Sequence, residues 1–196
     1  MSLKGHTTSV LALKQLPNGD LVSGSDDKTV RVWSLNDGSL KATLIGHTYI
    51  VYSLVVLPTG DLVSGSENEI IFWDLNNATN RTTLKHQNGR VLALLPNGDL
   101  ASGKYDLKIW DVSNGTVRKE LVSTNYTSFM ISSAVLANGD LVTGSNQGEI
   151  KIWDVNNGTV RASIDGNKYI SSLALRANGD LISGSYDSTI KIWRVD

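Results

Sequence analysis

The side chains that could do chemistry in this sequence are its carboxylates and its histidines. The 196 residues include 19 Asp and Glu, three His and no Cys. A pair of facing carboxylates would allow general acid–base cleavage of a glycosidic bond, and clustered His and acidic residues could hold a metal. Eleven of the acids, however, recur at fixed positions of a repeat, and the other eight form no convincing pair. We therefore predict no catalytic residue, no metal site and no cofactor, and hence that the protein is not an enzyme.

The elements that position these residues follow from an internal repeat. The tripeptide Gly-Asp-Leu occurs five times, and each copy is followed 12 to 14 residues later by a tryptophan. The five tryptophans are separated by steps of 40, 37, 43 and 40 residues, so all of them occupy one periodic position. His6, His47 and His86 also share one repeat position, which favours a structural role over metal binding or base catalysis. A repeat of about 40 residues must be interpreted before any single motif.

Each repeat has the pattern of four short strands. In the first repeat, residues 10–16, 21–25, 29–33 and 40–45 are apolar or alternate with period two, and turn-forming Asn, Asp and Gly separate them. Asn-Gly in the equivalent third turns of later repeats is a strong hairpin signal. No segment of ten or more residues has helical periodicity. Four strands per roughly 40 residues is typical of β-propeller blades.

The chain resembles the WD-repeat (WD-40 type) β-propeller family over nearly its whole length. The Gly-His motif of that family stands at Gly5-His6 and Gly46-His47 and weakens to Lys85-His86. The Trp-Asp motif stands at Trp73-Asp74, Trp110-Asp111 and Trp153-Asp154. The resemblance implies an all-β fold of five four-stranded blades. It also implies a scaffold that binds a protein or peptide without catalysis.

In that family a buried His, Ser or Thr, Asp and Trp form a hydrogen-bonded tetrad within each blade. The residues at these positions, in chain order, are His6, Ser23, Asp27, Trp33, His47, Ser64, Trp73, His86, Ser102, Asp106, Trp110, Thr143, Trp153, Ser183, Asp187 and Trp193. Asn68 stands near the missing acid of repeat two, Asn167 replaces the His of repeat five, and repeat four has Asn125 and Gln147. An amide hydrogen-bonds without charge assistance, so we expect the fourth blade to be held least firmly.

The two ends of the chain bear on how the propeller closes. We expect one domain over residues 1–196, with blades at about 5–45, 46–84, 85–123, 124–164 and 165–196, the last completed by residues 1–4. Ser2-Leu3-Lys4 aligns with Thr43-Leu44-Ile45, so the N-terminal strand would cover the open edge of the last blade. We favour a monomer that closes within one chain. Two alternatives remain: a strand-exchanged homodimer, and a piece of a longer repeat array.

Five tyrosines and two lysines indicate a partner-binding face. Tyr49, Tyr126 and Tyr169 follow the Gly-His position, whereas Tyr105 and Tyr186 directly precede the tetrad Asp. In WD propellers these two loop classes open on the same face, and exposed aromatic side chains there would anchor a partner. Lys104 and Lys168 lie in the same loops and could frame an acidic partner. Two alternatives stay open: a glycan-binding, lectin-like propeller, and a designed or amplified repeat with no selected ligand.

Composition excludes several other classes of function. Lys and Arg number 18 against 19 Asp and Glu, so no basic face for nucleic acid is expected. No apolar run approaches 18 residues, so we expect no membrane span. The N-terminus has no apolar signal-peptide core, and the absence of Cys fits a reducing compartment. We expect a cytoplasmic, intracellular protein whose partner the sequence does not identify.

Overall fold

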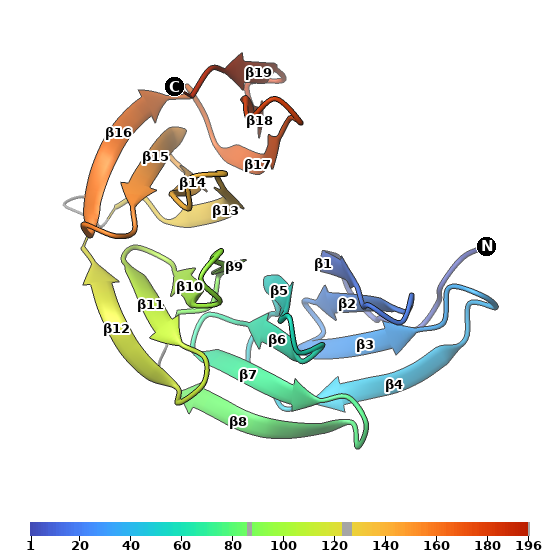
Figure 1. The fold of residues 1–196 in the computed structure, drawn as a ribbon. Coiled ribbons are helices and arrows are strands. Elements are labelled where there is room, and N and C mark those ends of the chain that lie inside the picture. Colours follow the sequence, from blue (N-terminus) through green and yellow to red (C-terminus); the bar gives the residue numbers. More distant parts are fainter. Residues whose placement is uncertain (86–87, 123–126, 196) are drawn as a thin grey trace. The chain divides into compact units, whose positions relative to one another are not determined.

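A computed structural model of the chain describes residues 1–85, 88–122 and 127–195. These residues form nineteen β-strands in five antiparallel sheets (Figure 1). No helix occurs among them, and so no segment of this part of the chain is a helix able to cross a membrane. The predicted all-β class with five blades is confirmed.

The first blade has the strands that the sequence predicts. It contains β1 (Val10–Gln15), β2 (Leu21–Ser25), β3 (Thr29–Trp33) and β4 (Leu40–Ile45), paired in sequence order. The turn between β1 and β2 is closed by Leu16 N–H, which donates to Asp20 O over 2.8 Å. The carbonyl of Leu16 then accepts from Gly19 N–H at 3.0 Å. The same two bonds recur in every repeat and use the Gly and the Asp of Gly-Asp-Leu, which explains why this tripeptide marks the repeat.

The following blades repeat this order with small changes of length. Blade two contains β5 (Ser53–Val56), β6 (Leu62–Gly65), β7 (Glu69–Asp74) and β8 (Thr79–Lys85). Blade three contains β9 (Val91–Leu94), β10 (Leu100–Gly103), β11 (Leu107–Asp111) and β12 (Thr116–Leu121). Blade four contains β13 (Met130–Val135), β14 (Leu141–Ser145), β15 (Glu149–Asp154) and β16 (Thr159–Asp165).

The fifth blade has three strands. They are β17 (Ile170–Leu175), β18 (Leu181–Ser185) and β19 (Ile190–Trp193). The expected fourth strand from residues 1–4 is not found, because Met1–Lys4 belong to no strand. Met1 and Leu3 instead lie beside the turn of the first blade, where a Cβ added to Gly38 would come within 3.3 Å of both side chains. Apolar packing near their own blade takes the place of backbone pairing.

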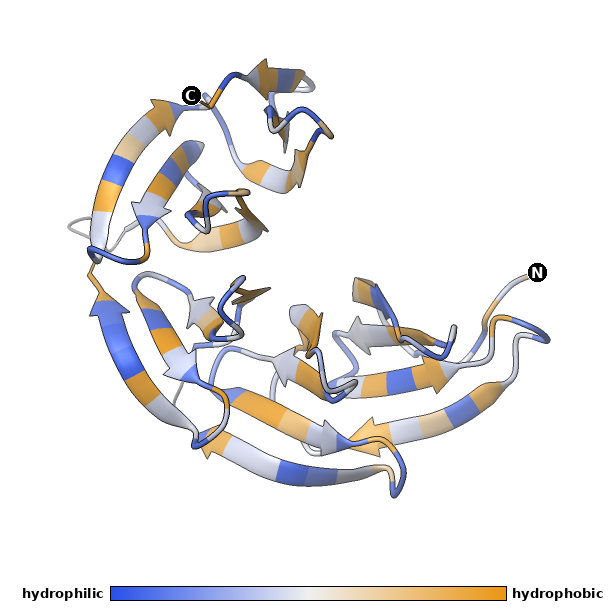
Figure 2. Cartoon of the chain, viewed as in Figure 1, coloured by the Kyte–Doolittle hydropathy of each residue, from blue (hydrophilic) through white to orange (hydrophobic). Residues whose placement is uncertain are grey.

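The chain divides into two compact units, Met1–Leu92 and Ala93–Asp196. Each unit contains a buried hydrophobic cluster. In the first unit, Val30 and Val32 of β3 form one buried cluster with Val51 and Leu54 of the second blade. In the second unit, Ile150 of β15 packs in the same way with residues of the fifth blade. Hydrophobic and hydrophilic residues alternate along several of these strands (Figure 2). Strands β2, β6, β10 and β14 are almost wholly buried, which places the core of the first four blades at their middle strands, whereas β18 of the fifth blade is partly buried.

A register shift precedes the tryptophan in each of the first four blades. The pairing of the third with the fourth strand is interrupted between Val32 and Trp33, and likewise at Trp73, Trp110 and Trp153. A bulge increases the local twist of a strand and redirects a side chain. The irregularity thus coincides with the residue whose indole must reach the neighbouring strand.

Candidate functional site

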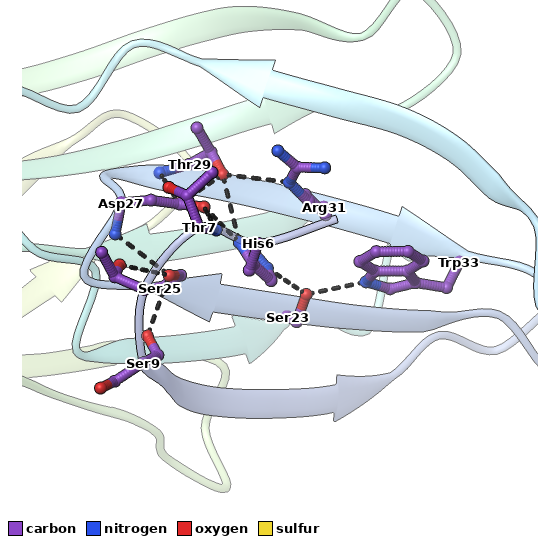
Figure 3. Close-up of polar contacts among 10 residues, drawn as sticks. His6, Thr7, Ser9, Ser23, Ser25, Asp27, Thr29, Arg31 and Trp33 are labelled. Atoms are coloured by element: carbon purple, nitrogen blue, oxygen red, sulfur yellow. Dashed lines mark hydrogen bonds and ion pairs between the residues drawn. The ribbon is translucent and has the colours of Figure 1, made fainter. Parts of the chain in front are cut away.

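The first blade contains a complete tetrad (Figure 3). Trp33 Nε1–H donates to Ser23 Oγ over 2.8 Å, and Ser23 Oγ lies 2.7 Å from His6 Nε2. The other ring nitrogen, His6 Nδ1, lies 2.8 Å from Asp27 Oδ2. A hydroxyl has one proton to donate, whereas an imidazole can present a donor at either nitrogen. This series of hydrogen bonds thus gives each of the four side chains a partner, and it joins the loop before β1 to β2 and β3.

Asp27 is held in its charged form by several donors. Burial by itself raises the pKa of Asp27, but hydrogen bonds from Thr29, His6 and the backbone of Thr7 outweigh burial and hold that pKa well below its ordinary value. The Thr29 hydroxyl donates over 2.6 Å and the Thr7 amide over 3.1 Å. The carboxylate is therefore a fixed structural acceptor, poorly suited to take up a proton in a reaction.

In the second blade the acid of the tetrad is a glutamate that the sequence did not reveal. Asn68 stands near the Asp position in the sequence, yet Glu69 is the residue that faces His47, with Oε2 lying 3.4 Å from His47 Nδ1. Glu69 also accepts from the Thr48 amide at 3.0 Å and the Thr48 hydroxyl at 2.9 Å. On the other side, His47 Nε2 lies 2.6 Å from Ser64 Oγ, to which Trp73 donates. The sequence contains a signal for this role, because Glu69 is an acid four residues before Trp73, where the first repeat has Thr29 four residues before Trp33.

The remaining blades keep the tryptophan–hydroxyl bond and vary the rest. Trp110, Trp153 and Trp193 donate to Ser102, Thr143 and Ser183 over 2.8, 2.8 and 2.9 Å. His86 and Asn125 lie outside the described residues, Asp106 is half-buried, and Gln147 is exposed. A cavity of about 10 Å³ lies beside Thr143 and Trp153. Whether blade four is held least firmly stays a prediction.

In the fifth blade an amide and an amine occupy the place of the histidine. Asn167 Nδ2 donates to Asp187 Oδ2 over 3.3 Å, and Lys191 Nζ donates to the same oxygen over 3.0 Å. The Thr189 hydroxyl, the first of several donors, holds the pKa of Asp187 well below its ordinary value. The residues predicted from the repeat are brought together here, with Lys191 as a member that the sequence did not indicate.

The periodic carboxylates outside the tetrads also have structural partners. Asp20, Asp99, Asp140 and Asp180 each accept from the Asn two residues earlier over 2.9 Å. The acids that follow tryptophan close the third turn: Asp111, for example, accepts from Ser113, whose hydroxyl lowers the pKa of that acid. Among the described residues no group of three or more His, Asp and Glu is arranged to bind a metal.

Two of the predicted face tyrosines form a stacked pair. The rings of Tyr169 and Tyr186 lie 4.5 Å apart with an interplanar angle of 20°. The Tyr186 amide donates to Tyr169 O over 3.0 Å, so the backbone joins the two loops. Tyr186 remains 68 % exposed, and the neighbouring Lys168 is exposed as well. We call Tyr169 and Tyr186 the tyrosine pair.

The other predicted face residues are arranged differently. Tyr105 is half-buried and meets Phe129 edge-to-face at 6.4 Å, with Lys104 Nζ 5.3 Å from its ring centre. Tyr49 is exposed, and Tyr126 lies outside the described residues. The sixth tyrosine, Tyr52, was not predicted to have a role, and the Arg90 guanidinium lies 4.2 Å from its ring centre.

Four-stranded blades with a tryptophan–hydroxyl–histidine–acid chain define a WD-type β-propeller. A family model described as "WD domain, G-beta repeat" matches residues 1–34, 38–74 and 158–194, more than half of the chain, and the protein belongs to this WD40 family. The structure is similar to the crystal structure of the WD40 beta propeller domain of Doa1, with a TM-score of 0.85 and 28 % sequence identity. That match covers 99 % of this chain and 66 % of the other, so the present chain spans slightly less than two thirds of its length. A comparison with curated proteins gave no match.

Proposed function

We propose that the protein is a non-enzymatic scaffold that binds an extended peptide of a partner protein at the tyrosine pair. A WD40 fold suggests a protein-interaction scaffold, and the tyrosine pair supports the more specific proposal. Tyr186 exposes most of its surface although its ring is already ordered by stacking and by the backbone bond to Tyr169. An anchor that is rigid before binding loses little side-chain entropy when a partner covers it.

The chemistry around the pair favours a partner with an apolar or proline side chain next to an acidic one. The open face of a tyrosine ring binds apolar groups well, while its hydroxyl remains available as a hydrogen-bond partner. Lys168 directly precedes Tyr169 and is exposed, so it can meet a carboxylate of the partner. An exposed charge contributes modestly to affinity and more to the rate of association.

The test is selection from a displayed peptide library, followed by affinity measurement for the selected sequences. Tyr186→Ala is expected to weaken binding by about 30-fold or more, as for a residue at the centre of an interface. Lys168→Glu is expected to weaken binding of acidic peptides and to reduce its salt dependence. Val160→Ala, at an exposed position of β16, is the matched control and should leave affinity unchanged.

The proposal would be wrong if selected peptides bound Tyr186→Ala as tightly as the unaltered protein. It would also be wrong if no peptide were selected and a glycan array gave micromolar binding, since this result would favour the lectin-like alternative.

A further inference from the structure

Asparagine followed by glycine occurs seven times in this chain, and this pair of residues can react with itself. The pairs begin at Asn18, Asn88, Asn97, Asn114, Asn138, Asn157 and Asn178. The backbone nitrogen of the glycine can attack the side-chain amide carbon of the asparagine, because glycine has no Cβ to obstruct the approach. Asparagine is accordingly counted among the thermolabile residues. Which pairs react in the folded protein depends on how each asparagine is held.

Six of the seven pairs lie in turns that require their glycine. These glycines have φ angles between 71° and 91°, and they are Gly19, Gly98, Gly115, Gly139, Gly158 and Gly179. A residue with a side chain is strained in this left-handed region. Protection from the reaction must therefore come from the asparagine rather than from replacement of the glycine. We call the asparagines of these six pairs the turn asparagines.

Four turn asparagines are held by the aspartate of Gly-Asp-Leu. Asn18 Nδ2 donates to Asp20 Oδ2 over 2.9 Å, while Asn18 Oδ1 accepts from the Asp20 amide at 3.0 Å. The same two bonds recur at Asn97, Asn138 and Asn178. Bonds at both ends of the side-chain amide restrict its rotation. They must break before the amide carbon can turn toward the glycine nitrogen.

The other two turn asparagines are held by the acid that follows tryptophan. Asn114 Nδ2 donates to Asp111 Oδ2 over 3.2 Å, and Asn157 Nδ2 donates to Asp154 Oδ2 over 2.7 Å. Asn114 Oδ1 also accepts from the Thr116 amide at 3.0 Å. In this turn, too, an aspartate keeps the side-chain amide in place.

Asn88 differs from the turn asparagines. It is exposed, and its side chain has no hydrogen-bond partner among the residues that the structure describes. Its glycine is needed for close packing instead of a turn, since a Cβ at Gly89 would lie 2.7 Å from Gly65 Cα. The Gly89 amide donates to Ser66 O over 2.8 Å, and the glycine amides of the six turns likewise donate to a carbonyl. The glycine nitrogen is thus held in all seven pairs, and they differ in the freedom of the asparagine side chain.

We propose that Asn88 is the site of spontaneous deamidation in the folded protein, and that the aspartates of the turns protect the other six asparagines. The Gly89 nitrogen loses its proton to a base in solution and forms a bond to Asn88 Cγ. The bond between Cγ and Nδ2 then breaks and releases ammonia. Water opens the resulting cyclic imide to aspartate or isoaspartate. Either product adds one negative charge to a chain whose formal net charge is −1.

Peptide mapping of the ageing protein tests this assignment. The folded protein is kept at mildly alkaline pH, and samples taken at intervals are digested with trypsin and analysed by mass spectrometry. Lys85 and Arg90 delimit the peptide 86–90, which contains Asn88 and no other asparagine. We expect Asn88 to react about tenfold faster than any turn asparagine, because each of those must first break hydrogen bonds of ordinary strength.

Unfolding and one substitution separate protection by the turns from the chemistry of the dipeptide itself. In urea the seven rates should agree within about threefold, since the hydrogen bonds are then lost. Asp154→Ala removes the acceptor of Asn157, while Asn114 keeps Asp111 in the same protein as a matched control and Arg161 retains its second ion pair. The rate at Asn157 should rise about tenfold and that at Asn114 should stay unchanged. Circular dichroism verifies that the variant is folded.

Asn88→Ala supplies a measurement on the intact protein. Ion exchange separates the more acidic species that deamidation produces, and the fast phase of their formation should be missing in this variant.

Three results would contradict the proposal. The first is a turn asparagine that reacts as fast as Asn88 in the folded protein. The second is an unchanged rate at Asn157 in Asp154→Ala, since the aspartate would then give no protection. The third is formation of acidic species in Asn88→Ala at the rate of the unaltered protein. None of these results concerns the tyrosine pair, so the proposed function is tested separately.

Discussion

The Nδ1 atom of His47 lies 3.4 Å from Oε2 of Glu69, while its Nε2 lies 2.6 Å from the hydroxyl of Ser64. The distance to Glu69 is too long for a good hydrogen bond, and Nδ1 has no hydrogen-bond partner among the described atoms. Burial lowers the pKa of His47 to about 4, although the charge of Glu69 acts in the opposite direction. His47 is therefore neutral at pH 7 despite the nearby carboxylate, because burial lowers its pKa by more than Glu69 raises it.

The protein should lose stability on mild acidification through His47. Its pKa is about 4 in the folded state against 6.5 ordinarily, so the unfolded chain takes up the proton first as the pH falls. The contribution of neutral His47 to the free energy of unfolding is complete above pH 6.5 and shrinks between pH 6.5 and 4. About 2 kcal/mol of this free energy is lost by pH 5. Urea unfolding at pH 7.5 and 5 measures it. His47→Asn introduces the residue that the fifth repeat has at the equivalent position, Asn167. The free energy of unfolding of this variant should fall by about 2 kcal/mol less between pH 7.5 and 5 than that of the unaltered protein. An equal fall would show that His47 is not the group responsible.

Removing the charge of Glu69 should lower the pKa of His47 further. The carboxylate raises that pKa against the effect of burial, and Glu69→Gln keeps the shape while deleting the charge. Titration of the His47 ring signals by NMR checks this. Glu67→Gln, at a half-buried acid two residues earlier, is the control and should leave the pKa in place. A pKa that rose in Glu69→Gln would show that the carboxylate does not act on His47 through its charge.

Trp33→Ala should lower the free energy of unfolding by about 3–5 kcal/mol, as removal of a large core aromatic does. Trp33 is 2 % exposed and donates to Ser23, so its loss leaves a cavity and removes one of the two hydrogen-bond partners of the Ser23 hydroxyl. Trp193→Ala should cost less, because Trp193 is half-buried. Urea unfolding compares the two variants. A loss under about 1 kcal/mol for Trp33→Ala would mean that the indole contributes little to the core.

Ala78→Gly should stabilise the protein. Ala78 closes the turn between β7 and β8 with a φ of 52°, where the first, third and fourth blades have Gly38, Gly115 and Gly158 at 71–77°. A side chain in this left-handed region costs about 1–2 kcal/mol, part of which the higher entropy of unfolded glycine offsets. We expect a gain of about 0.5–1 kcal/mol in thermal or urea unfolding. Gly158→Ala makes the opposite change at the equivalent position of the fourth blade and should lower the free energy of unfolding by a similar amount. If both substitutions changed stability in the same direction, the explanation would be wrong.

The repeat could be predicted from the sequence because one periodic pattern determines both the strands and turns of a blade and the residues that form its core. The predicted segments 21–25, 29–33 and 40–45 match the observed strands of the first blade, and β1 ends one residue earlier than predicted. Turn residues set the strand ends, while the tryptophan and the hydroxyl of the second strand are fixed by their position in the hairpin. Each of these features depends on residues close together in the chain.

The parts that the sequence did not reveal depend on side-chain length or on contacts between loops. Glu69 reaches the position of an aspartate from a different place in the backbone, whereas the residue nearest to that position in the sequence pattern is Asn68. Lys191 of β19 reaches back to Asp187, four residues earlier in the turn before that strand. The stacking of Tyr169 on Tyr186 depends on how two separate loops meet. Met1–Lys4 resembled an outer strand by alignment, yet alignment does not determine whether a segment finds a pairing edge.

The five indoles have one further consequence, for the spectroscopy of the protein. Each lies at the same place in its blade and donates to a hydroxyl. Trp193 is half-buried, whereas the other four are buried. Four residues should therefore emit at short wavelength in the native state, with a red-shifted component from the fifth blade. Proteins that keep one tryptophan and carry Phe at the other four positions would report the opening of each blade separately, without any attached dye.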